Sequence, residues 1–242
     1  MIKVENTDVY GFQHATKAAR NPMNSWDKSD SNYCGDIKNC DECRYNEYPN
    51  VCNNPIADGE DYIIGKNDLD LMQRLHKAGT EHRTYARMIY VWMDITAPLY
   101  WWKEMDRYTV GKSQVSTSTM HKIHAKKFEL DDFSHEHISN ESILIKENGQ
   151  HYLNSTLDNL KDTIDVLNTY RKQYLQTKDK EDWWQLIQLL PSSYNQKRTV
   201  CMSYEVVFKI IKERTGHRLD EWNEFVEILK ELPYVKEIME IE

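Results

Sequence analysis

The chain has 242 residues, enough to bury a substantial core in one large domain or two small ones. Glycine (8) and proline (6) are scarce, which argues against an all-β fold with many turns and against flexible linkers. The net charge of −8 and the lack of a basic run argue against a protein that binds long nucleic acids. A small anionic ligand needs only a few local arginines and stays compatible with this composition.

The N-terminal residues form no apolar signal region, and no stretch of the sequence approaches the length of a membrane span. We therefore expect a cytoplasmic protein that has no membrane partner. Its five cysteines should be mostly reduced unless they bind metal.

The first half of the chain predicts short helices and strands separated by two polar segments. The elements expected in chain order are a strand at residues 2–4, a helical segment at 11–20, a helix at 68–77, a buried strand at 87–95 and a helix from 98 to 105. Residues 34–56 are polar and rich in Cys, Asn and Asp, which indicates a loop insertion. Residues 108–120 are small and polar, which indicates a surface or binding loop.

The second half of the chain is predominantly helical. Ser155 is placed to cap a long helix whose apolar positions include Leu160, Ile164 and Leu167. The further elements expected are a helix at 183–190, a short strand at 198–202, a helix from 203 that ends before Gly216, and a helix at 220–232. The whole pattern predicts an α+β fold, a helix-rich single domain over residues 1–242 with a small central β-sheet.

Two tryptophan pairs lie at helical positions. Trp101-Trp102 and Trp183-Trp184 suit core or subunit contacts better than platforms for stacking a ligand. The abundance of tyrosine (15) and tryptophan (7) in the chain fits the same interpretation, because aromatic side chains supply much of the buried area in cores and interfaces.

Four of the five cysteines lie within nineteen residues of one another in the polar segment 34–56. Cys40 and Cys43 have the two-residue spacing of a metal knuckle, and Cys34 and Cys52 could complete a tetrahedral zinc site. Reduced free thiols are the main alternative, and an iron–sulfur cluster is a further one. Cys201, in the strand expected near residue 200, is more simply a small buried hydrophobic residue.

Three stretches of the chain resemble the flavin-dependent thymidylate synthase family. The first is Ala-Ala-Arg at residues 18–20. The second, at residues 71–107, has the family's order of helix, glycine, strand and Ala-Pro-led helix, and it ends at the start of an arginine-bearing signature. The third, at residues 189–222, contains a Leu-Pro, a helix that ends in arginine, and a nearby His and Trp. These stretches span most of the chain in the family's order.

The family signature begins Arg-His-Arg and continues with a serine, an Asn-Glu pair, a second serine and an Arg-Tyr. Arg107 matches its first arginine. Gln114 stands in place of the asparagine, while Lys112 and Thr117 fall on the two serines. Towards the C-terminus, Arg214 matches an arginine that contacts the pyrimidine in the family.

The resemblance implies an α/β homotetramer with active sites shared between subunits. It also implies an enzyme that methylates C5 of dUMP or a related pyrimidine nucleotide, using FAD and a folate one-carbon donor. The flavin carries the methylene and the hydride in this family, so no protein nucleophile is required, and the protein supplies positioning and charge. The lack of a recognisable nucleophile–base arrangement in the sequence therefore says little against an enzyme.

Arginine suits such a site because its planar fork binds oxyanions and donates to carbonyl oxygens. By resemblance, Arg107 would bind the substrate phosphate and Arg214 would recognise the base, with Lys112 as a third candidate cation. Residues of the polar loop would lie near the flavin or hold its diphosphate through backbone N–H groups, and the candidates are Gln114, Ser116 and Thr117.

The alternatives stay open at this point. Each of these cations could be a solvated surface charge, and a Ser/Thr-rich loop is commonly just solvated. A second hypothesis is a non-catalytic nucleotide-binding or protein-interaction module on the same fold, with the cysteine segment as an added contact. A third is an enzyme that modifies the pyrimidine C5 in a different way.

Overall fold

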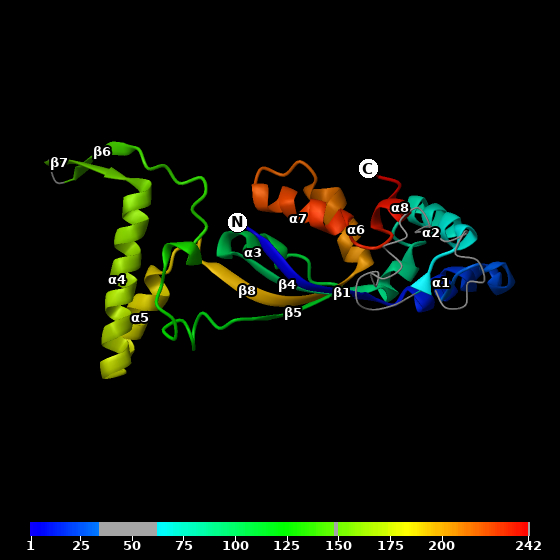
Figure 1. Ribbon diagram of the computed structural model, residues 1–242, viewed down its shortest axis with the longest axis horizontal. Helices are drawn as coiled ribbons and strands as arrows, with labels where there is room; N and C mark the ends of the chain where they lie inside the picture. Colours follow the sequence, from blue (N-terminus) through cyan, green and yellow to red (C-terminus); the bar gives the residue numbers. More distant parts are fainter. Residues whose placement is uncertain (34–61, 148–149, 242) are drawn as a thin grey trace, which may run out of the picture. The chain divides into compact units, whose positions relative to one another are not determined.

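The computed structural model describes residues 1–33, 62–147 and 150–241 (Figure 1). The helices are α1 (Phe12–Arg20), α2 (Lys66–Ala78), α3 (Leu99–Met105), α4 (Thr156–Thr177), α5 (Lys180–Leu189), α6 (Tyr204–Arg214), α7 (Asp220–Lys230) and α8 (Val235–Met239). The strands are β1 (Lys3–Tyr10), β2 (Asn32–Tyr33), β3 (Tyr62–Ile63), β4 (Tyr90–Pro98), β5 (Lys112–Ser116), β6 (Ser142–Glu147), β7 (Gln150–Ser155) and β8 (Asn195–Ser203). The expected helix-rich α+β class with a small sheet is confirmed.

Four strands form the main sheet, in the order β1-β4-β8-β5. Backbone hydrogen bonds beyond the strand ends show that β4 and β8 are antiparallel: Leu99 donates to the carbonyl of Tyr194 at one end, and Tyr204 donates to the carbonyl of Ile89 at the other (3.0 and 2.9 Å). β8 ends at Ser203, and α6 begins at the next residue.

Side chains on β4 alternate between a core face and an open face. Val91, Met93 and Ile95 are at most 1% exposed, whereas Tyr90 and Trp92 are 37% and 38% exposed. This alternation is typical of an antiparallel sheet that has one face packed on a core and the other face open.

Residue contacts divide the chain into two compact units, each described here by itself. The first comprises residues 1–3, 96–106 and 116–198, and the second comprises 4–95, 107–115 and 199–242. Each unit is assembled from separate segments of the sequence.

The core of the first unit includes one apolar face of α4. Leu160, Ile164 and Leu167 on this helix are buried, as their spacing predicted. Ser155 is the N-cap of α4, because its Oγ accepts from the backbone N–H of Asp158 (3.0 Å). The other buried members of this cluster are Ile123, Phe128, Phe133 and Leu186.

Both tryptophans of α3 are fully buried in the first unit, and their ring centres lie 4.9 Å apart. The indole N–H of Trp102 donates to the carbonyl of Gln196 (3.0 Å), which satisfies its polar atom in the core. The predicted structural role of this pair is confirmed.

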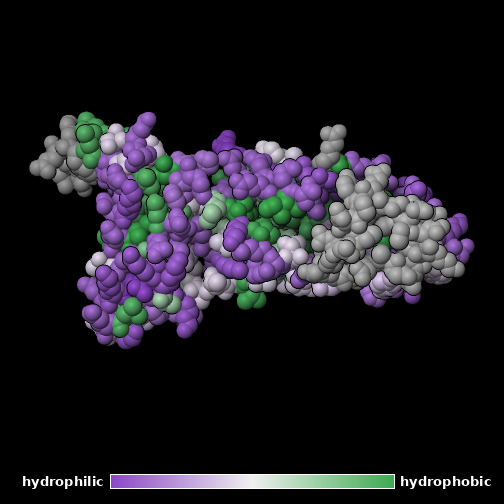
Figure 2. Space-filling model, viewed as in Figure 1, coloured by the Kyte–Doolittle hydropathy of each residue, from purple (hydrophilic) through white to green (hydrophobic). Residues whose placement is uncertain are grey.

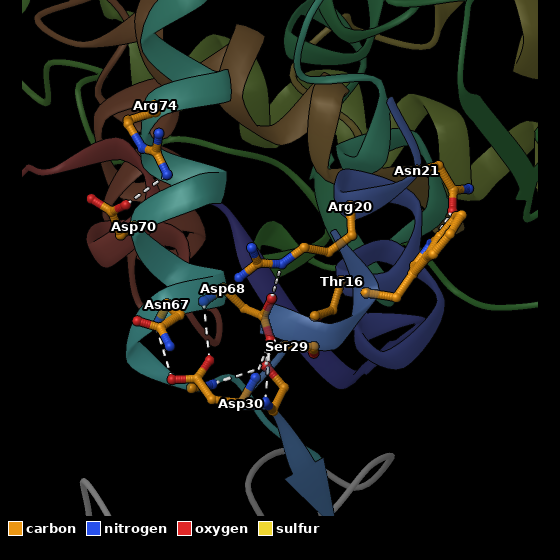
Figure 3. A network of polar contacts seen from close by, with 12 residues as sticks. Thr16, Arg20, Asn21, Ser29, Asp30, Asn67, Asp68, Asp70 and Arg74 are labelled. Carbon is orange, nitrogen blue, oxygen red and sulfur yellow. Dashed lines mark hydrogen bonds and ion pairs between the residues drawn. The ribbon is translucent and has the colours of Figure 1, made fainter. Parts of the chain in front are cut away.

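A buried ion pair joins α1 to α2 in the second unit (Figure 3). Arg20 Nε donates to Asp68 Oδ1 (2.7 Å), and the two side chains are 6% and 1% exposed. The other carboxylate oxygen of Asp68 accepts hydrogen bonds from Ser29 Oγ (2.7 Å), Ser31 Oγ (2.6 Å) and the backbone N–H groups of Asp30 and Ser31 (both 3.1 Å). One buried carboxylate thus holds α1, α2 and the chain from 29 to 31 together.

The residues on either side of 34–61 pair with each other in the structure. β2 and β3 pair antiparallel, with Tyr33 opposite Tyr62, and the two rings make an edge contact with centres 5.2 Å apart. Tyr33 and Tyr62, on either side of residues 34–61, are therefore held one strand spacing apart.

One sequence-based expectation needs correction, and one element was not expected. Lys112–Ser116, within the predicted polar loop, is strand β5 at the edge of the main sheet, because backbone pairing with β8 decides its conformation. The hairpin β6–β7 was not predicted. It exposes apolar side chains (Figure 2), with Ile143, Leu144 and Leu153 58%, 64% and 70% exposed.

None of the helices in the described residues combines the length and the apolar character needed to cross a membrane.

Candidate functional site

The C-terminal end of α6 carries an arginine held among aromatic side chains in the second unit. The guanidinium carbon of Arg214 lies 4.5 Å from the ring centre of Trp222 and 5.6 Å from that of Tyr108. Arg214 Nε donates to the hydroxyl of Tyr108 (2.9 Å). A guanidinium that both stacks on rings and donates a hydrogen bond is restricted in rotation and tilt.

The local sequence explains how these residues meet. The buried face of α6, which includes Val207 and Ile211, fixes the rotation of the helix and hence the direction of its last residue. Gly216, with a φ of +71°, supplies the left-handed conformation after the helix. The chain then turns into α7, whose Trp222 is fully buried.

Tyr108 lies between a cation and an anion. Its hydroxyl donates to Glu213 Oε2 (3.0 Å) while it accepts from Arg214. Burial is the largest influence on the pKa of Tyr108 and raises it; the bond from Arg214 lowers the pKa and the bond to Glu213 raises it, for a net increase. The phenol therefore keeps its proton at physiological pH.

His217 borders the same guanidinium. Its Nε2 lies 3.1 Å from Arg214 Nη1, and its Nδ1 accepts from the backbone N–H of Leu219 (3.1 Å). The backbone contact fixes the orientation of the imidazole ring beside the arginine. We call the set Tyr108, Glu213, Arg214, His217 and Trp222 the Arg214 cluster.

The predicted substrate-binding residues Arg107, Lys112 and Arg214 all belong to the second unit. Arg107 precedes Tyr108 directly and is exposed. Lys112 Nζ donates to Gln114 Oε1 (3.1 Å) along β5, so these two side chains share one face of that strand.

Of the other two predicted cofactor residues, Ser116 ends β5 and Thr117 follows it. Ser116 and Thr117 are both exposed. The backbone N–H of Thr117 donates to Lys197 O (2.9 Å), and its carbonyl accepts from Gln196 Nε2 (2.7 Å). Because this N–H is already bonded to β8, the expectation that Thr117 would offer it to a phosphate is not met, whereas its side-chain hydroxyl is still exposed.

Two members of the cluster were missed by the sequence reasoning. Tyr108 and Glu213 each adjoin a predicted arginine, and that adjacency was the only sequence signal for them. His217 and Trp222 were indicated by the family resemblance alone.

The predicted zinc ligands Cys34, Cys40, Cys43 and Cys52 lie outside the described residues. Over 1–33, 62–147 and 150–241, no group of three or more His, Cys, Asp or Glu side chains is placed to hold a metal ion. The zinc site stays a prediction.

Comparison of the sequence with protein-family models and with curated proteins finds no match. Solved structures do match. A flavin-dependent thymidylate synthase (ThyX) from Helicobacter pylori, complexed with FAD and dUMP, is 14% identical with a TM-score of 0.60 over 98% of this chain and 97% of that one. A second structure of the H. pylori protein, also with FAD and dUMP, is 14% identical with a TM-score of 0.57 and covers 96% of each chain.

The chain has the flavin-dependent thymidylate synthase fold.

A third match is the UMP/dUMP methylase PolB from Streptomyces cacaoi, bound with 5-Br UMP. It is 12% identical, with a TM-score of 0.50 over 72% of this chain and 83% of that one. The flavin-dependent thymidylate synthase fold thus covers nearly the whole of this chain, in agreement with the resemblance drawn from the order of the sequence stretches.

Proposed function

We propose that the protein binds dUMP or a related pyrimidine nucleotide through the Arg214 cluster and methylates the base at C5. The observation that carries this proposal is the orientation of Arg214 by Tyr108 and Trp222 on a fold whose solved examples are described with dUMP or 5-Br UMP. In this assignment Arg214 donates to a carbonyl oxygen of the base, while Arg107 and Lys112 bind the phosphate.

The hydrogen bonding of Arg214 closes one way of binding an oxyanion and is compatible with a carbonyl oxygen of a base. Bidentate binding of an oxyanion from the side of a guanidinium uses Nε together with one terminal nitrogen. Tyr108 occupies Nε here, which closes that mode. A single carbonyl oxygen can still approach a terminal nitrogen, and a uracil base presents such oxygens.

Several residues suit a flavin only in part. The exposed hydroxyls of Ser116 and Thr117 and the amide of Gln114 can donate to its oxygens, whereas the backbone N–H of Thr117 cannot. When bound, FAD would carry the methylene from a folate donor and supply the hydride. The residues of this chain would then hold and orient the nucleotide and, in a closed site, exclude water.

A second candidate function is nucleotide binding without catalysis. It is favoured by the positions at which this sequence departs from the family signature. Lys112 and Gln114 replace a serine and an asparagine there, and their side chains bond to each other. A third is another modification of the pyrimidine C5. All three candidate functions use the same nucleotide site, and they differ in whether and how a flavin takes part.

The decisive experiment is calorimetric titration of the purified protein with dUMP, UMP and dCMP, followed by addition of FAD. We expect dUMP or UMP to bind and dCMP to bind more weakly, because its exocyclic amino group is a donor facing another donor. Appearance of a bound-flavin spectrum would support the methylation proposal. Nucleotide binding without flavin uptake would support the function of nucleotide binding without catalysis. If no nucleotide bound, the proposal would be overturned.

We also propose a homo-oligomer, a tetramer by resemblance, in which the open face of the main sheet meets a second copy. Tyr10, Tyr90 and Trp92 form an aromatic group there, with the ring centres of Tyr10 and Tyr90 5.8 and 6.0 Å from that of Trp92. Beside them, Asp94 accepts hydrogen bonds from the neutral side chains of Asn6 (3.0 Å) and Thr199 (2.6 Å). An exposed aromatic group of this kind suits contact with an identical chain.

Trp92→Glu should raise the dissociation constant of the oligomer about thirtyfold, as loss of an aromatic hot spot worth about 2 kcal/mol would. Sedimentation velocity over a concentration series measures it. The control is Trp26→Glu, which alters a tryptophan that is 50% exposed elsewhere in the second unit. A wild-type monomer at every concentration, or equal behaviour of the two variants, would contradict this surface.

We further propose that the protein works in the cytoplasm, where nucleotides and folate are available and cysteines stay reduced.

A further inference from the structure

We infer that Tyr108 is a positioning residue that holds Arg214 in the orientation needed to recognise the pyrimidine base. The inference rests on the proposed function and assigns a role to a residue that the sequence did not indicate. It is carried by the contacts of one hydroxyl group.

The polarity of that hydroxyl is fixed. A phenol has a single hydrogen, and Tyr108 gives it to Glu213 Oε2 (3.0 Å). Its oxygen lone pairs are then left for Arg214 Nε (2.9 Å). Because Glu213 takes the phenolic hydrogen, Tyr108 can act only as an acceptor towards Arg214 Nε. In this contact the Glu213 carboxylate acts on Arg214 through the phenol.

The ring of Tyr108 is itself firmly placed. The residue is 5% exposed, and its ring makes an edge contact with Trp222, with centres 6.2 Å apart. Lys209 Nζ lies 5.6 Å from the ring centre. A hydroxyl on a buried ring has little freedom, so it can hold a flexible partner.

Arginine is costly to immobilise, because its side chain has many rotamers. A bond at Nε and a ring against the guanidinium plane remove most of that freedom before any ligand arrives. Such preorganisation improves affinity by lowering the entropy lost on binding. Phenylalanine at position 108 keeps the ring and removes both hydrogen bonds.

We expect Tyr108→Phe to weaken dUMP binding about tenfold, the size of one hydrogen bond to a charged group. Binding of deoxyribose 5-phosphate, which lacks the base, should be unchanged. If Tyr108 only supported the local structure, its loss would weaken the binding of both ligands. Calorimetry with dUMP and deoxyribose 5-phosphate therefore separates a positioning role from a structural one. The control is Tyr33→Phe, which removes an exposed hydroxyl bonded to Gln13.

A second measurement needs no nucleotide. In the free wild-type protein the Nε–H of Arg214 should exchange slowly with solvent by NMR, and in Tyr108→Phe it should exchange rapidly. If wild type binds no dUMP, the proposed function fails, and this exchange rate still decides whether Tyr108 holds Arg214. If wild type binds dUMP and Tyr108→Phe matches Tyr33→Phe in both measurements, the inference is overturned while the function stands.

Discussion

We expect the Asp68→Ala variant to lose about 3–5 kcal/mol of the free energy of unfolding, the usual cost of leaving one member of a buried ion pair without its partner. Asp68 is the carboxylate to which Arg20 donates, and both side chains are almost inaccessible to solvent. The same substitution removes the acceptor of four further hydrogen bonds that fix residues 29–31. The loss should therefore reach both α1 and the start of β2.

Asp70→Ala is the matched control, since Asp70 lies two residues further along α2 (Figure 3). It pairs with Arg74, but the two side chains are 62% and 65% exposed, and such pairs contribute little. Urea unfolding of the three proteins gives the comparison. Similar losses for Asp68→Ala and Asp70→Ala would contradict the role assigned to the buried pair.

The contribution of Asp68 should depend on pH. Burial alone would raise the pKa of Asp68, but hydrogen bonds from Ser31, Ser29 and Arg20 outweigh burial and lower the pKa below its usual range. A carboxyl group with a lowered pKa in the folded protein contributes stability that is complete above its unfolded pKa of about 4. That stability is lost as the pH falls further, so Asp68→Asn should differ less from wild type at low pH than at neutral pH.

The second large effect is expected at the proposed nucleotide site. Arg214→Ala should weaken dUMP binding by about a hundredfold or more, because truncating one partner of a desolvated, hydrogen-bonded contact costs about 2–5 kcal/mol. Arg214→Lys should recover only part of this affinity, since an ammonium group cannot stack flat on Trp222 or donate from Nε to Tyr108.

Calorimetry with dUMP measures the effect, and Arg218→Ala supplies the control. Arg218 lies four residues further on, is exposed, and makes none of the contacts of the Arg214 cluster. Circular dichroism of the free variants checks that both stay folded. An Arg214→Ala variant that binds dUMP as tightly as Arg218→Ala would remove this arginine from the site.

Much of the fold could be predicted because local signals and tertiary packing agree. Ser155 caps α4, and the spacing of Leu160, Ile164 and Leu167 matches the buried face of that helix. β5 could not be predicted in this way. Its sequence Lys-Ser-Gln-Val-Ser is polar because it forms an exposed edge, and its strand conformation comes from pairing with β8, about 80 residues later in the chain.

Site residues could be predicted where the family resemblance indicated them. They could not be predicted where only a contact between residues far apart in the sequence brings them to the site. Arg214 was expected to bind a ligand, and the structure places aromatic and polar partners around it. Tyr108 lies 106 residues before Arg214, and no periodicity or spacing indicates that the two meet. The position of Gly216 after α6 was expected, but not its effect of bringing Trp222 against the guanidinium.

The pairing of β2 with β3 has a consequence for replacing the cysteine-bearing segment at residues 34–61. Tyr33 and Tyr62 face each other across a two-residue ladder, so a connection between them has to bridge only one strand spacing. A short engineered turn in place of residues 34–61 should therefore leave both flanking strands where they are.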